Sequence, residues 1–141
     1  MIQRIQSLFL FLVDIVLVIL LFVPYASMTM VTEIPGPVQY YTLMDNSGLL
    51  VGQVVLCILA ALIMAMFRNR PLQMKLCLAG VALSLLYTLL LAYNAVFPMM
   101  GAHWNIEPGT YISFANPVLF LLARNFIKRD ENLVKSTDRI R

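Results

Sequence analysis

The sequence predicts an all-α integral membrane protein: a four-helix bundle with both termini cytoplasmic and a short cytoplasmic amphipathic segment at the C-terminus. Three observations predict this fold. The chain of 141 residues is 61% hydrophobic and 12% charged, whereas ordinary soluble domains are about 25% charged. It contains four long apolar runs, and about twenty apolar residues in a helix cross a bilayer. All 10 Lys and Arg residues lie on one side of these runs.

The first predicted span covers about residues 8–28. Its central run, LFLFLVDIVLVILLFV, carries a single charged residue, Asp14. A secretory signal peptide is the alternative, because a basic start precedes an apolar core. The length of the run, the missing A-x-A pattern and the three later spans favour a membrane span.

The remaining elements follow in order. Residues 29–48 are predicted to form an outer loop, because Pro, Gly and Asn punctuate them. The second and third spans are expected over about 49–67 and 75–97, joined by a tight charged turn. After a second outer loop the fourth span covers about 110–127, and Asn116-Pro117 predicts a bent or late first turn. A polar tail over 128–141 completes a single domain, 1–141.

The basic residues set the predicted orientation. Cytoplasmic loops are enriched in Lys and Arg, and short loops follow this rule best. Both termini are therefore expected in the cytoplasm, and the net charge of +3 reflects topology rather than a nucleic-acid partner. The ten residues are Arg4, Arg68, Arg70, Lys75, Arg124, Lys128, Arg129, Lys135, Arg139 and Arg141.

Asp14 is the main candidate for a functional group inside the membrane. It lies about six residues into the first span, on the order of 9 Å from the cytoplasmic boundary. A charge at such a depth is costly, so intramembrane acids usually face a bundle interior, a cavity or a basic partner. Two interpretations stay open. Asp14 couples transport to protons or cations, or it pairs with Arg68, Arg70 or Arg124 near the interface.

Asn94 and Arg124 are the other intramembrane candidates. Asn94 belongs to a polar group in the third span that interhelical hydrogen bonding explains, with a substrate-lining role as the alternative. A membrane enzyme acting on lipid or quinone would have only Asp14, Asn94, Arg124 and His103 to work with, at differing depths. No catalytic, cofactor-binding or metal-ligating set is predicted, because the sequence contains no nucleophile–base pattern, P-loop or dinucleotide fingerprint.

The C-terminal tail has amphipathic spacing. As a helix from Asp130 to Arg141 it would place its few apolar residues on one face. We expect it to lie on the cytoplasmic leaflet or to dock a partner, with a solvated, frayed terminus as the alternative.

Three segments carry a family resemblance. They are the opening MIQRIQS, the turn FRNRPLQMKLC over residues 67–77, and the ending KRDENLVKSTDRIR over residues 128–141. The chain resembles a family of small four-span inner-membrane proteins of Bacteroidota, catalogued as a domain of unknown function. The resemblance implies a bacterial inner-membrane location and no assigned catalytic residues.

Two functions are expected from these features. The first is a polytopic membrane protein without catalytic activity or cofactor, an accessory or structural subunit of a larger complex of the translocon, secretion or respiratory type. Its partners would be the lipid bilayer and other membrane subunits or further copies of itself. The alternative is a small proton-coupled transporter that uses Asp14. The expected partner-docking residues are Arg4, Arg68, Arg70, Lys75, Lys128, Arg129 and Asp130.

Overall fold

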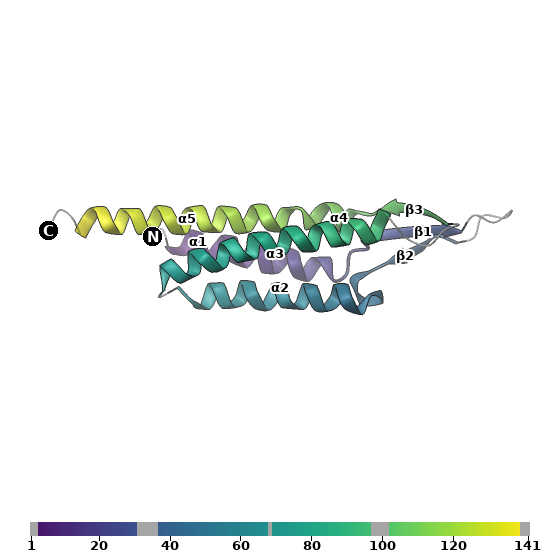
Figure 1. Ribbon diagram of the computed structural model, residues 1–141, viewed down its shortest axis with the longest axis horizontal. Coiled ribbons are helices and arrows are strands. Elements are labelled where there is room, and N and C mark those ends of the chain that lie inside the picture. The colour runs from purple at the N-terminus through teal and green to yellow at the C-terminus, as the bar shows by residue number, and fades with distance from the viewer. Residues whose placement is uncertain (1–2, 31–36, 68, 97–101, 139–141) are drawn as a thin grey trace.

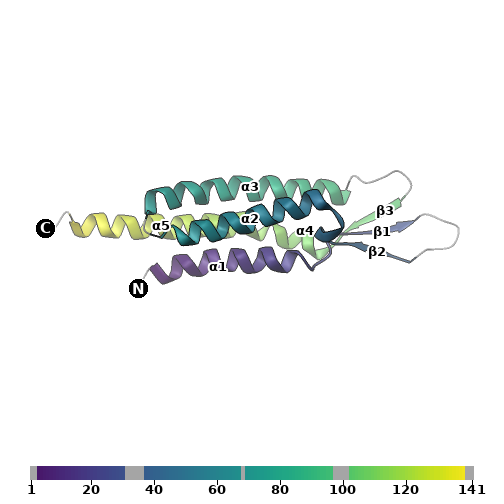
Figure 2. The same ribbon diagram turned by 90° about the horizontal axis from the view of Figure 1, so that it is seen from below.

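The structure is a computed structural model that describes residues 3–30, 37–67, 69–96 and 102–138. Within these residues four long helices pack side by side, and a small sheet projects from one end (Figures 1 and 2). Helix α1 packs against α2 and α5, and α3 also packs against α2 and α5. The four long helices confirm the predicted helical layout. They are α1 Gln3–Leu20, α2 Ser47–Ala65, α3 Arg70–Val96 and α5 Ala115–Asp138.

The two ends of the bundle differ in character. Both termini and the turn between α2 and α3 lie at one end, which we call the charged end (Figure 1). The sheet and the short helices η1 (Leu43–Asp45) and α4 (Pro108–Ser113) lie toward the other, which we call the sheet end (Figure 2). Successive long helices therefore run in opposite directions.

The sheet corrects the all-α prediction. Within the described residues, strands β1 (Ala26–Met30), β2 (Gln39–Tyr41) and β3 (Ala102–Ile106) form an antiparallel sheet in the order β2-β1-β3. Ala26 is paired with both Tyr41 and Ile106. Strands β2 and β3 lie in the two expected outer loops, whereas most of β1 was expected to belong to the end of the first span. Pairing satisfies backbone N–H and C=O groups that a loop would leave to solvent.

Helix α1 ends earlier than the first predicted span. It stops at Leu20, whereas the span was predicted to reach residue 28. Pro24 explains the difference, because the proline ring disfavours helical geometry at the residue before it. The chain then enters the sheet, and the Tyr25 N–H donates to the Tyr41 carbonyl at 3.0 Å.

The C-terminal tail also differs from its prediction. Helix α5 continues without interruption to Asp138, so residues 128–138 extend the fourth helix instead of forming a separate amphipathic segment. The tail contains no Gly or Pro before that point, and Lys, Arg and Glu are good helix formers. The break occurs at Phe114, between α4 and α5, and Pro117 falls in the first turn of α5, where no intrahelical N–H bond is lost. The helical segment that begins at Pro108 is thus interrupted close to Asn116-Pro117, where a bent or late first turn was expected.

The core of the bundle contains polar as well as apolar side chains. Phe9 of α1 stacks on Phe126 of α5 with ring centroids 4.9 Å apart. The buried Gln53 amide on α2 donates to the Leu17 carbonyl of α1 at 2.6 Å, and the Tyr87 hydroxyl on α3 donates to the Leu49 carbonyl of α2 at 3.0 Å. Buried polar side chains therefore tie neighbouring helices together through backbone carbonyls.

Asp45 in helix η1 leads to a prediction about pH. The Thr42 N–H and hydroxyl donate to Asp45 Oδ2 at 2.7 and 2.9 Å, and these bonds hold the pKa of the Asp45 carboxyl below its usual value. Because the folded-state pKa is the lower one, ionised Asp45 stabilises η1 above about pH 4, and this contribution is lost as the pH falls through the folded-state value. NMR titration of the Asp45 carboxyl carbon should give the depressed pKa; an ordinary value would contradict the expectation.

Candidate functional site

The outside of the bundle is covered by large apolar side chains. Helix α2 exposes Val51 to 62%, and α3 exposes Leu86 to 55%. Soluble proteins rarely expose contiguous apolar patches of more than a few hundred Å². We call this surface the apolar belt, and its main members are Phe11, Ile15, Val18, Val51, Ile58, Leu62, Leu85, Leu86, Leu89, Val118 and Leu121.

Two helices in the described part of the chain are long and apolar enough to cross a membrane. They are Ser47–Ala65 and Arg70–Val96. The apolar part of α1, Leu8–Leu20, is shorter. The 19 residues of α2 rise about 28 Å at 1.5 Å per residue, which matches the ~30 Å of bilayer hydrocarbon.

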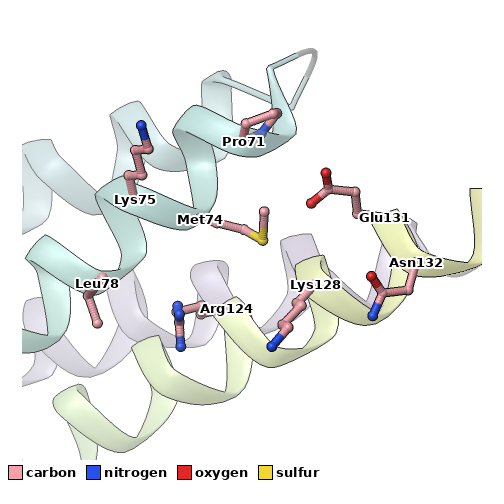
Figure 3. Close-up of a pocket in the computed structure, with 8 residues that line it drawn as sticks. All are labelled: Pro71, Met74, Lys75, Leu78, Arg124, Lys128, Glu131 and Asn132. Atoms are coloured by element: carbon pink, nitrogen blue, oxygen red, sulfur yellow. The ribbon is translucent and has the colours of Figure 1, made fainter. Parts of the chain in front are cut away.

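A groove lies between α3 and α5 at the charged end, with a volume of about 410 Å³ (Figure 3). Met74 projects from α3 into the space between the two helices, while Arg124 and Lys128 project from α5 (Figure 3). The Glu131 carboxylate is directed into the same space, whereas the Lys75 ammonium is directed away from α5 (Figure 3). We call it the basic groove, and it is lined by Pro71, Met74, Lys75, Leu78, Arg124, Lys128, Glu131 and Asn132.

Arg70 and Asp130 form an ion pair between the start of α3 and α5. Arg70 Nη1 lies 3.1 Å from Asp130 Oδ2, and the two side chains are 23% and 10% exposed. The α2–α3 turn is also held by Gln73, whose buried amide donates to the Ile63 carbonyl at 3.0 Å. Arg70 and Asp130 were both expected on a partner-docking surface; they contact each other within the protein, and their role in docking stays a prediction.

The intramembrane candidates do not come together. Asp14 is half-buried on the side of α1 toward α2, close enough to act electrostatically on the Cys57 thiol. It makes no ion pair with the residues that the structure describes, and Arg70, one of its expected partners, binds Asp130. Asn94 donates to the Leu90 carbonyl one turn earlier in its own helix, at 2.8 Å. Arg124 belongs to the basic groove.

The other predicted docking residues separate into three groups. Lys75 and Lys128 line the basic groove. Arg129 is exposed on α5 and does not line it. Arg4 belongs to α1, but its side chain is outside the described part of the structure, as is the whole of Arg68. The spacing of Arg124 and Lys128 is visible in the sequence. That residues of α3 form the other side of a groove beside them is not.

The groups that the basic groove offers are cations, one carboxylate, one amide and apolar side chains. Within the described ranges no three His, Cys, Asp or Glu side chains gather closely enough to hold a metal ion. The basic groove instead combines cations with an apolar wall, an arrangement suited to binding an anion that carries apolar groups.

One family model matches the chain. The family is described as a domain of unknown function, DUF4293, and the match covers residues 2–140. This match confirms the predicted relationship to an uncharacterised family. No curated protein matches the chain.

Proposed function

Because the chain belongs to the DUF4293 family, a domain of unknown function, we propose that it is a non-catalytic integral membrane protein. In this proposal it is an accessory or structural subunit of a larger complex in the bacterial inner membrane. Its four long helices cross the bilayer, and its two termini lie in the cytoplasm.

The apolar belt carries the membrane part of the proposal. Phe11, Val51 and Leu86 are each more than half exposed, and they lie on three different helices. Full burial of such a side chain is worth about 1.5–3 kcal/mol, and the half that is still exposed here gains about half of that in lipid, so a bilayer stabilises the bundle where water would not. The polar side chains Gln53, Ser84 and Asn116 are buried instead, and Gln53 joins α2 to α1, as polar groups do in membrane bundles.

The positions of the cations support the proposed orientation. Lys75, Arg124 and Lys128 are gathered at the charged end, where both termini also lie (Figure 1). Cytoplasmic segments are enriched in Lys and Arg. In this orientation the sheet lies on the periplasmic side, and the exposed charge of Arg129 is available to a cytoplasmic or membrane partner.

The internal hydrogen bonds favour a structural role over a catalytic one. Gln53, Gln73 and Tyr87 are buried, and each donates to a backbone carbonyl of another helix. These groups therefore hold helices together and are not directed at a substrate. A subunit that must keep its shape within an assembly benefits from such bonds, each worth about 1 kcal/mol or less in membranes.

Alkaline carbonate extraction and native purification test this function. We expect the full-length protein to stay in the membrane pellet at high pH and, in mild detergent, to copurify with stoichiometric membrane partners. For orientation, single cysteines would replace Arg129 and Gln39 in a background without Cys57 and Cys77. A membrane-impermeant thiol reagent should label Gln39→Cys in intact cells and Arg129→Cys only after lysis. Release by carbonate would contradict the membrane location, and a lone monomer would contradict the subunit role.

Asp14 motivates the second candidate, a small proton-coupled transporter. Its side chain on α1 is half-buried, and it makes no ion pair within the described residues. An intramembrane acid of this kind is a reasonable proton site. If the chain moves protons, proteoliposomes containing a pH-sensitive dye should show a flux that Asp14→Asn abolishes and Asp45→Asn leaves intact. A flux that Asp14→Asn does not change would eliminate this candidate.

A further inference from the structure

We propose that the basic groove binds the phosphate headgroup of an anionic phospholipid. The proposal rests on the membrane location proposed above. It adds to that function a defined lipid site, positioned where the apolar belt meets the charged end.

The charge of the groove selects an anion. Its α5 side carries the cations Arg124 and Lys128 and one acid, Glu131, for a formal balance of 2 − 1 = +1, while the ammonium of the lining residue Lys75 is directed away from α5 (Figure 3). Arg70 directly precedes the lining residue Pro71, but its charge is paired with Asp130. It therefore adds little to the net charge of the groove. The groove also adjoins the first turn of the 27-residue helix α3 at Pro71, and the positive end of a helix dipole favours an anion.

The spacing of the two α5 cations favours a shared ligand. Arg124 and Lys128 are four residues apart, so they lie on one face of the helix about 6 Å apart along its axis. Like charges at this spacing repel each other and destabilise a helix. A phosphate between them removes that repulsion, because the guanidinium can bind two of its oxygens while the ammonium binds as a point charge.

The apolar side of the groove favours a lipid over a soluble phosphate. Met74 and Leu78 of α3 line it together with the cations, and Leu78 is 51% exposed. Leu78 lies on the same helix as the belt residue Leu85, so acyl chains could follow α3 into the bilayer. The volume of about 410 Å³ falls within the ~300–1,000 Å³ typical of small-molecule sites.

Native mass spectrometry of the full-length protein, with phosphatidylglycerol or phosphatidylcholine added, tests the site. We expect the wild type to retain phosphatidylglycerol preferentially. Lys128→Gln and Arg124→Gln should each weaken that binding about fivefold, since one cation near a lipid surface contributes about that factor. Arg129→Gln is the matched control, because it removes the same charge from the neighbouring exposed position outside the groove. Lys128→Arg should retain binding.

The outcomes separate this site from the proposed membrane location. Circular dichroism should give the same helical content for every variant, which establishes that weaker binding is not unfolding. Equal losses for Lys128→Gln and Arg129→Gln, in a protein that carbonate leaves in the membrane, would overturn the site alone. Complete displacement of the lipid by millimolar inorganic phosphate would overturn the lipid as ligand. Extraction of the wild type by carbonate would overturn both the location and the site.

Discussion

Replacing Gly109 with valine should unfold the sheet end of the protein. The Gly109 N–H donates to the Pro24 carbonyl at 3.0 Å, so the start of α4 lies directly against the segment that follows α1. A Cβ at Gly109 would be 2.7 Å from the Pro24 oxygen and 3.0 Å from its carbonyl carbon. These are backbone atoms, which cannot rotate away, so the two segments must separate. We expect the free energy of unfolding to fall by about 2–3 kcal/mol.

Two further bonds make this junction important for the sheet. The Glu107 N–H and the Thr110 hydroxyl both donate to the Tyr25 carbonyl, at 3.1 and 2.8 Å. Tyr25 directly precedes β1, and Glu107 directly follows β3. Separation of Gly109 from Pro24 would therefore weaken the bonds that position both strands.

Thermal unfolding in detergent, followed by circular dichroism, would measure the effect of Gly109→Val. Gly48→Ala is the control, because a Cβ at that exposed position in the first turn of α2 meets only Asn46 Oδ1, at 3.4 Å. Alanine there should be neutral or stabilising by up to about 1 kcal/mol. A Gly109→Val protein that unfolds at the wild-type temperature would show that the junction tolerates a side chain.

The long helices could be predicted because their signal is local. Each apolar run is near the length of a membrane span, and charged residues mark the turn between α2 and α3. Helix ends were less predictable. Pro24 ends α1 through its effect on Val23, yet the apolar composition continues past it. The tail has no local stop signal before Asp138, so α5 continues where a change in composition suggested a boundary.

The sheet could not be predicted, because one of its two pairings, β1 with β3, is distant in sequence and the strands are short. Met28 pairs with Trp104 across most of the chain, and no sequence periodicity reports such a contact. The strands are only three to five residues long, too short for a clear alternating pattern. The nearby Pro and Gly residues indicated loops.

The basic groove shows the same limit. The positions of Arg124 and Lys128 on one face follow from helical spacing. That Met74 and Leu78 of α3 complete the groove depends on how α3 and α5 pack. Gly80, two residues after Leu78, permits close packing of α3 on α5, because a Cβ there would be 2.8 Å from the Phe120 ring.

Separating Arg70 from Asp130 should produce the second large effect. The two atoms Arg70 Nη1 and Asp130 Oδ2 are 3.1 Å apart, and Asp130 is the more buried partner, at 10% exposed against 23%. Removing one member of a buried pair leaves the other charge uncompensated. Arg70→Gln should therefore lower the free energy of unfolding by about 2 kcal/mol, and Asp130→Asn by about 1 kcal/mol, after allowance for the partial exposure of the pair.

A double-mutant cycle distinguishes this internal role from partner docking. If the pair joins α3 to α5, Arg70→Gln and Asp130→Asn together should cost about 1 kcal/mol less than the sum of the two single changes. Arg129→Gln, next to Asp130 but exposed, should leave the stability unchanged. The contrary outcome has two parts: neither single change alters the free energy of unfolding of the isolated protein, and a copurifying partner is lost. That outcome would show that the two residues act in partner docking. The ion pair predicts the opposite result, because its energy is internal to the chain and must be measurable when no partner is present.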